Sequence, residues 1–362
     1  MHHHHHHVLK LFFLLSLLTF TSASKKCMDP NGNAVDWYAV FLFPENSSVD
    51  NTLSYGYFDS SSSSMSYYTY SESTFPPTRI TEMALSSSST NYFFWNDDLT
   101  CKDDSESRSA SSTRAHAKGS LVYDSSSGAF LLHSLPRFPT CLTSGSVLTE
   151  LPNNAGIYGQ HFLCISVTTA TANKLAELLN YINVSNNHSV NADKVNSSAN
   201  QWVTKLIDNN FDSSYPTNYD TTIYSVNGTP FRFFGKNYKY EVIPYDTTLR
   251  SAYADSFYVR TWTRPSYAPS LCDSYQLLNV LDVSYNGKWA FTKTKEHSKW
   301  AVAANKSVAC FGDVNHVESQ AKRGGNIVCF EHSGLASAMR NAIVNLDSCS
   351  NDAYHGFLQF VE

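Results

Sequence analysis

Two short motifs in the sequence combine the same two chemical groups, an imidazole and an ammonium, at the same spacing. His116-Ala117-Lys118-Gly119 lies in the first half of the chain, and Glu296-His297-Ser298-Lys299-Trp300 lies in the second half. In an extended segment, residues two apart point to the same face, so each His and Lys would project into one site. Such a pair suits a phosphodiester, because the lysine neutralises phosphate oxygens while the histidine attacks phosphorus or moves a proton. Two pairs half a chain apart predict two lobes that each supply half of one active site.

The segments around the motifs indicate strands joined by tight turns. Residues 116–123 are predicted to form a strand, 124–128 a turn, and 129–133 a return strand that would bring His133 near His116. Leucines and isoleucine at helical spacing predict a helix over residues 169–182. A second helix is expected to begin at Ser333, which would cap it, and to bury one face that runs from Leu335 to Leu346.

Length and composition indicate a large mixed fold. The chain has 362 residues, of which 42% are hydrophobic and 14% aromatic. This is enough for one large domain or two fused domains, and the aromatic content favours a β-rich or mixed α/β body over a helical bundle. The polar, Asn-rich stretch 183–200 suggests a surface connection, so we place the lobe boundary near residue 215, between lobes 25–215 and 216–362.

Residues 1–24 read as a leader. Six histidines, 2–7, resemble an expression tag, with a natural run as the alternative. Lys10, a short apolar run and small residues at 21–24 then form the pattern of a secretory signal peptide, too short for a typical spanning helix. Eight cysteines fit the same oxidising route, and no Cys-x-x-Cys spacing suggests a zinc ribbon. The sequence therefore predicts a secretory-pathway protein without a membrane anchor.

Further signals concern glycans, charge and acidic side chains. The glycosylation candidates are Asn46, Asn183, Asn187, Asn196 and Asn227, while a glycan at Asn305 would crowd the second motif. The formal charge is −5 with neutral histidines, so protonation in an acidic compartment would help the chain hold a polyanion. Four acids before the first motif could in principle hold a metal, although loop acids more often keep a loop solvated: Asp97, Asp98, Asp103 and Asp104.

A longer set of segments gives the two motifs a context. In order, these are VDWYAVFLFP, NDD, HAKGSLVYD, LLHSLPRFP, YGQHFLCIS, EHSKW, CFGDVN and KRGGNIVC, which run from Val35 to Cys329. In this order they resemble the deoxyribonuclease II family, a branch of the phospholipase D-like superfamily. The resemblance implies a mixed α/β fold of two pseudo-repeated lobes, each a β-sheet flanked by helices, that share one active site.

The resemblance also implies a reaction and assigns residues to it. It implies an acid endodeoxyribonuclease that needs no metal or other cofactor and works through a phosphohistidine, leaving 3′-phosphate and 5′-hydroxyl ends. His116 is then the nucleophile and His297 the general acid, with the reverse assignment open. Lys118, Lys299 and Asn315 would bind phosphate oxygens, and His133 would support the site or the substrate. Here the Gly-Ser-x-Asn element of the superfamily becomes Gly312-Asp313-Val314-Asn315.

Two further residues, Gly119 and Arg323, each have two possible roles. Gly119 either lets the substrate approach or eases a tight strand, and Arg323 either touches DNA phosphate or belongs to a structural turn. The expected disulfides are Cys27–Cys164, Cys101–Cys141, Cys272–Cys349 and Cys310–Cys329; the cysteine that the family often has after His-Ser-Lys-Trp is Ala301 here. The partner would be DNA, held mainly through its phosphates by a lysosomal or secreted monomer or homodimer. The alternatives are hydrolysis of other phosphodiesters and a secreted effector or binding protein on a deoxyribonuclease II scaffold.

Overall fold

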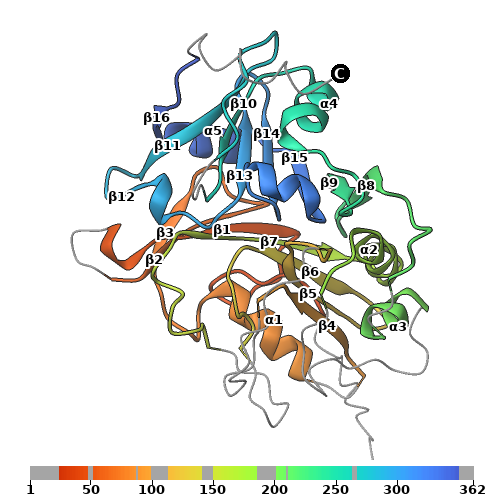
Figure 1. Cartoon of the computed structure of the whole chain (residues 1–362). Helices are drawn as coiled ribbons and strands as arrows, with labels where there is room; N and C mark the ends of the chain where they lie inside the picture. Colours follow the sequence, from red (N-terminus) through yellow and green to blue (C-terminus); the bar gives the residue numbers. More distant parts are fainter. Residues whose placement is uncertain are drawn as a thin grey trace, which may run out of the picture.

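The computed structural model describes residues 24–47, 52–86, 89–98, 113–140, 150–185, 201–208, 211–262 and 267–349. Among them, two β-sheets pack face to face, with helices around them (Figure 1). The chain is therefore a mixed α/β protein, as the sequence predicts.

The first sheet has seven strands in the order β3-β2-β1-β7-β6-β5-β4, and all neighbours are antiparallel. Its central strands are buried on both faces, which explains their continuous apolar and aromatic runs. Its strands are β1 Trp37–Leu42, β2 Ser54–Asp59, β3 Ser66–Thr69, β4 Asn91–Asn96, β5 Lys118–Tyr123, β6 Gly128–His133 and β7 Gln160–Val167.

The second sheet has nine strands in the order β12-β11-β10-β13-β14-β15-β9-β8, with β16 paired to β11. Only β10 and β11 run parallel among the pairs of this sheet. Its strands are β8 Asn218–Tyr224, β9 Pro230–Lys236, β10 Phe257–Arg260, β11 Leu277–Tyr285, β12 Trp289–Thr292, β13 Trp300–Ala303, β14 Val308–Gly312, β15 Gly325–Glu331 and β16 Ile343–Leu346.

The main core lies between the two sheets. Successive residues of β1 point to opposite faces, so Trp37 and Phe41 face the second sheet. Trp37 packs edge-on against Phe330 at 4.7 Å between ring centroids, and Phe41 packs against Phe311 at 5.6 Å. Aromatic pairs of this kind bury large apolar areas and hold the two layers together.

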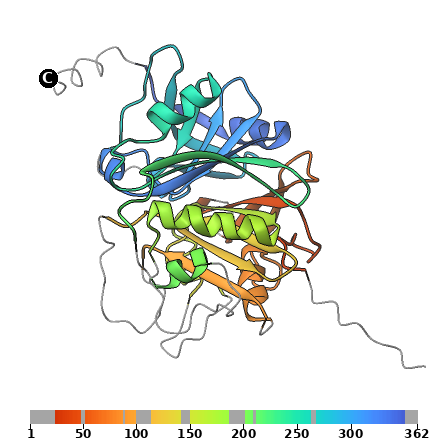
Figure 2. The same ribbon diagram turned by 90° about the vertical axis from the view of Figure 1, so that its right-hand side faces the viewer.

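The helices cover the remaining faces and edges. Helix α1 (Pro76–Leu85) packs on the outer face of the first sheet, and α2 (Thr169–Ile182) lies along the junction of the two sheets (Figure 2). The short helices α3 (Gln201–Ile207) and α4 (Arg250–Tyr253) follow. Helix α5 (Ser333–Asn341) begins where expected, but its cap is His332, and the helix is shorter than predicted because residues 343–346 form β16.

Other sequence predictions can be placed on this fold. Three of the four expected disulfides are present, namely Cys27–Cys164, Cys272–Cys349 and Cys310–Cys329. The fourth pair, Cys101–Cys141, lies outside the described residues. The first sheet ends at Val167 and the second begins at Asn218, but the sheets differ in strand number, and the pseudo-repeat stays a prediction.

Several strands of both sheets begin or end at one common end of the molecule. In the first sheet, Asn96 at the end of β4 is paired with Lys118 at the start of β5. In the second sheet, Arg260 at the end of β10 is paired with Trp300 at the start of β13. An isolated parallel bridge between Gly159 and Glu296 joins the two sheets at this end. Loops from both halves of the chain therefore meet here.

Candidate active site

Both His-x-Lys motifs lie at this common end, but the histidines are not in strands. Strand β5 begins at Lys118, and β13 begins at Trp300, so His116 and His297 lie in the segments that enter the strands. The strand predicted to begin at His116 therefore begins two residues later, at Lys118. The backbone N–H of His116 donates to the carbonyl of Gly324 (2.9 Å), and that of His297 donates to Gly159 (2.8 Å). Each motif is thus held by the other half of the chain.

Side-chain contacts bring the two motifs together. The Nδ1 atom of His116 lies 2.8 Å from the carbonyl oxygen of Asp313, in the loop after β14. Because a carbonyl only accepts, His116 carries its proton on Nδ1, and its Nε2 bears the lone pair. On the other side, the backbone N–H of Lys299 donates to Nδ1 of His161 (3.0 Å) at the start of β7. His161, in the first sheet, therefore holds the backbone of Lys299 in the second half of the chain.

Asp97 supplies the counter-charge of the site. Its carboxylate, only 5% exposed, forms an ion pair with Lys118 and accepts a hydrogen bond from Arg323 (3.0 Å). Its second oxygen lies 3.8 Å from Nε2 of His116. Burial opposes the charge of Asp97, but Lys118 and His116 outweigh it and hold the pKa of this carboxyl well below its usual range. Asp97 is therefore buried beside His116 and Lys118, and is not the solvated loop acid that the sequence suggested.

The buried environment shifts the protonation of the reactive groups. Burial, together with the nearby lysines, lowers the pKa of both His116 and His297 to about 3. Burial also lowers the pKa of Lys299 to about 7, with Lys118 adding to this shift, and raises the pKa of Asp313 to about 7. At mildly acidic pH these shifts leave both imidazoles neutral and Lys299 charged.

Aromatic rings enclose His297. Its imidazole is stacked on Tyr158 at 4.0 Å with an interplanar angle of 6°, and Trp262 meets it edge-on at 4.8 Å. An aromatic face attracts a cation, so the stacking on Tyr158 favours the imidazolium form of His297.

A buried ion pair between Arg260 and Glu296 holds the backbone of the second motif in place. Arg260 and Glu296 are 0% and 1% exposed and lie 3.0 Å apart. Arg260 also donates to the carbonyls of Leu281 (2.7 Å) and Phe291 (3.2 Å), and Glu296 accepts from the backbone of Ser298 (3.0 Å). The charges are thus compensated by hydrogen bonds, and the backbone on both sides of His297 is held in place.

The other predicted residues divide into two groups. His133 and Asn315 are buried, and both ring nitrogens of His133 and the Oδ1 of Asn315 lack a partner among the described residues. Gly119, in contrast, is packed, since a side chain there would collide with Trp95 and the carbonyl of Leu131. Arg323 donates to Asp97 and to the carbonyl of Arg114 (2.7 Å), so the structure favours a structural role for it.

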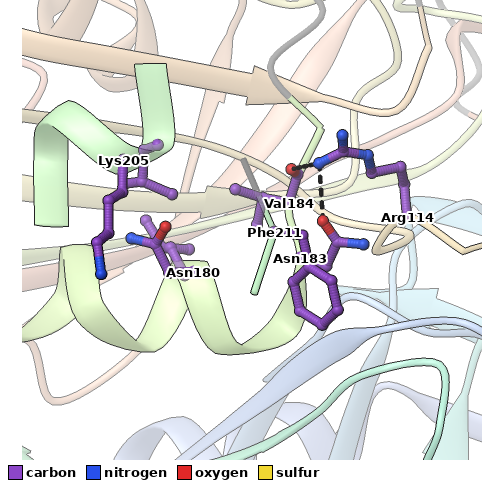
Figure 3. Close-up of a pocket in the computed structure, with 8 residues that line it drawn as sticks. Arg114, Asn180, Asn183, Val184, Lys205 and Phe211 are labelled. Carbon is purple, nitrogen blue, oxygen red and sulfur yellow. Dashed lines mark hydrogen bonds between the residues drawn. The ribbon is translucent and has the colours of Figure 1, made fainter. Parts of the chain in front are cut away.

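A pocket adjoins the first motif at the end of α2 (Figure 3). Arg114 donates from Nη1 to Oδ1 of Asn183 (2.7 Å) and to the carbonyl of Val184 (3.3 Å), and Nδ2 of Asn183 donates to Thr113 (2.9 Å). These bonds fix the segment that leads to His116. They also oppose glycosylation of Asn183, because the amide that would carry the glycan is hydrogen-bonded and the residue is only 5% exposed.

The remaining glycosylation candidates are open to the solvent or not described. Asn46 and Asn227 are exposed, whereas Asn187 and Asn196 lie outside the described residues.

Within the described ranges, no three His, Cys, Asp or Glu side chains form a group that could hold a metal ion. None of the helices described is long and apolar enough to cross a membrane.

Sequence reasoning missed three residues that contact the motifs, namely Tyr158, His161 and Trp262, and it misjudged Asp97. His161 is fully buried, and its Nε2 has no partner among the described residues. The segments NDD and YGQHF did signal the neighbourhood of three of these residues, but not their roles. Trp262 had no local signal, since its contact with His297 depends on the pairing of β10 with β13.

Comparison with known proteins gives the fold and site a context. A family model described as deoxyribonuclease II matches residues 26–349. Mouse deoxyribonuclease-2-alpha is 28% identical over 351 residues, covering 93% of this chain and 97% of the mouse protein. Deoxyribonuclease-2 of Caenorhabditis elegans is 27% identical over 380 residues, with 94% and 98% covered. Plancitoxin-1 of Acanthaster planci is 26% identical over 354 residues, with 94% and 97% covered.

The family match and these relatives define the chain as a hydrolase of the nuclease class. The chain belongs to the deoxyribonuclease II family, because the family model matches it over residues 26–349.

Replacement of Asp97 by Asn tests the counter-charge. This change leaves Lys118 and Arg323 without their buried carboxylate, so we expect a loss of about 3–5 kcal/mol in the free energy of unfolding, measured by urea denaturation. Because the pKa of Asp97 is depressed in the folded protein, its contribution is complete above its ordinary value of about 3.9 and is lost only at lower pH. The deficit should therefore be the same at pH 5 and pH 7.

The matched control is Asp98→Asn, one residue further on, where the side chain is 45% exposed. It should change the free energy of unfolding by less than about 0.5 kcal/mol. Equal losses for the two variants would contradict the role of Asp97.

Proposed function

We propose that this protein is an acid endodeoxyribonuclease that hydrolyses DNA phosphodiesters without a metal ion and leaves 3′-phosphate and 5′-hydroxyl ends. The observation that carries the proposal is the meeting of two His-x-Lys motifs at one centre, where Lys118 and Lys299 both act on the pKa of His116 and His297. Two lysines can neutralise the phosphate oxygens, and two histidines can divide the roles of nucleophile and acid. The DNA substrate follows from the family and from the names of its relatives.

In the first step, Nε2 of His116 attacks phosphorus. Its lone pair is available because Nδ1 donates to the carbonyl of Asp313. The N–P bond forms, the bond from phosphorus to the 5′ oxygen breaks, and His297 gives its proton to that oxygen. In the second step, His297 takes a proton from water, the water oxygen attacks phosphorus, and the N–P bond breaks. The products are a 3′-phosphate and a free His116.

The assignment of His297 as the acid rests on its surroundings. The stacked face of Tyr158 favours an imidazolium there, whereas His116 has no such ring contact among the described residues. The pKa of His297 is low because burial and two lysines oppose its charge. A bound phosphate brings negative charge next to the ring and reverses this balance, so the substrate itself would load the acid with its proton.

Compartment and specificity follow the same proposal. Disulfides and exposed sequon asparagines suit a lysosomal or secreted enzyme that meets DNA in an oxidising, acidified space. Recognition through phosphates and a small number of lysines predicts little preference for base sequence.

The acid optimum can be tested through Lys299. Below pH 7 this lysine is charged, since its pKa is lowered to about 7, and above about pH 3 His116 is neutral. We therefore expect the cleavage rate to fall as the pH rises through about 7, where Lys299 loses the charge that would hold the phosphate. Lys299→Arg cannot lose its charge in this range, so its alkaline limb should move to higher pH even if its maximum is lower. An unchanged alkaline limb would show that Lys299 does not set it.

Plasmid cleavage at about pH 5 with excess chelator tests the reaction itself. The wild-type protein should nick and cut the plasmid, and His116→Ala and His297→Ala should each lose at least about 100-fold in rate. The new 5′ ends should accept label from a polynucleotide kinase without phosphatase treatment, because they carry hydroxyl groups. Cleavage that needs a restored divalent metal would refute the two-histidine mechanism. No cleavage by a folded, disulfide-intact protein would favour the binding or effector alternative.

A further inference from the structure

Next to His297 lies a surface with a composition unlike that of the chain as a whole. We call it the lysine–aromatic surface, and its residues are Tyr158, Trp262, Tyr267, Lys293 and Lys295. Lys295 is exposed, and the other four are half-buried. They come from the loop before β7, the segment after β10 and a short 3-10 helix, Lys293–Lys295, between β12 and β13.

The lysines of this surface lie over its rings. Nζ of Lys293 is 3.9 Å from the ring centroid of Tyr267, and Nζ of Lys295 is 5.9 Å from that of Tyr158. Tyr158 is in turn stacked on His297, and Trp262 meets the same imidazole. The surface is thus continuous with one of the two reactive groups.

The surface is also a local excess of positive charge on an acidic chain. The formal net charge of the protein is −5, but residues 288–300 contain four lysines and one acid, Glu296. That acid is buried and paired with Arg260, so it does not neutralise its neighbours. In the part of the chain that the structure describes, neither Lys293 nor Lys295 forms an ion pair. Unpaired lysines between aromatic rings are the chemistry that holds phosphates and stacks bases of a single strand.

We propose that the lysine–aromatic surface binds the nucleotides on the 3′ side of the scissile phosphate, which leave with the 5′-hydroxyl. This inference rests on the proposed function and adds a direction to it. His297 protonates the leaving 5′ oxygen, so the nucleotide attached to that oxygen lies beside His297 and its neighbouring rings. Lys293 and Lys295 then contact the next phosphates of the leaving strand, and the rings of Tyr158 and Trp262 face its first sugar and base.

The test removes the two charges and keeps the apolar stems, in the double variant Lys293→Met/Lys295→Met. One substrate is a single-stranded oligonucleotide that extends on the 3′ side of the cut. The other is thymidine 3′-(4-nitrophenyl phosphate), which has no nucleotide on that side. We expect kcat/KM for the oligonucleotide to fall about tenfold, and its slope against log salt to fall by about 1–2 as two phosphate contacts are lost. The nitrophenyl ester should be cleaved at the wild-type rate, within about twofold.

The matched control is Lys174→Met/Lys306→Met, which removes the same charge elsewhere. Lys174 lies in the first half of α2, and Lys306 lies in the turn between β13 and β14, at the opposite end of that hairpin from Trp300. This control should leave both substrates unaffected. An equal loss on both substrates in the Lys293/Lys295 variant, or no loss on either, would overturn the proposal. So would a loss confined to oligonucleotides that extend only on the 5′ side.

A binding measurement separates this inference from the proposed function. If the wild-type protein cleaves neither substrate, the proposed function fails. Fluorescence anisotropy of a labelled oligonucleotide still tests whether the lysine–aromatic surface binds nucleic acid. Weaker binding by the Lys293/Lys295 variant than by the control would support it, and equal binding by the two variants would overturn it.

Discussion

The site depends on the contact between one buried carboxylate and the cations around it. Lys118 and Arg323 reach Asp97 from β5 and from the loop before β15, so a single charge joins the two halves of the chain. Two lysines that act on the same pair of histidines would repel each other without this partner. Asp97 balances Lys118 and Arg323, while Lys299 keeps no ion-pair partner among the described residues. The arrangement leaves cationic charge for a phosphate to neutralise.

Function follows from how the two sheets meet. Their inner faces share one aromatic core, and the loops at one end exchange backbone and side-chain hydrogen bonds across the junction. His116 is held by Asp313 from the second sheet, and Lys299 is held by His161 from the first. Each motif is held by contacts from the other half, and a slight slip between the sheets would separate His116 from His297. The packing that stabilises the fold therefore also sets the geometry of the reaction.

Local sequence patterns predicted the elements whose bounds are set by neighbouring residues. Helix α2 has the predicted bounds because its apolar spacing agrees with a Thr168 cap, whose side chain accepts from Thr171. The predicted strand start at His116 was wrong, because the backbone of His116 bonds to distant Gly324, and pairing with β4 begins only at Lys118. Asp97 was misjudged because its burial requires Arg323, more than 200 residues away. The two motifs marked the site, but tertiary contacts decided which neighbours complete it.

The division of labour between the two histidines is the central claim, and a substrate with sulfur in place of the scissile 5′ oxygen tests it most directly. A thiolate leaves without a proton, so this substrate removes the need for a general acid and keeps the need for a nucleophile. The account predicts that His297→Ala releases the thiol in a burst of about one equivalent per enzyme at near the wild-type rate, while His116→Ala releases none. Later turnovers of His297→Ala should stay slow, because His297 also takes the proton from the attacking water. Rescue of His116→Ala instead would reverse the assignment, and rescue of neither variant would contradict the two-step mechanism.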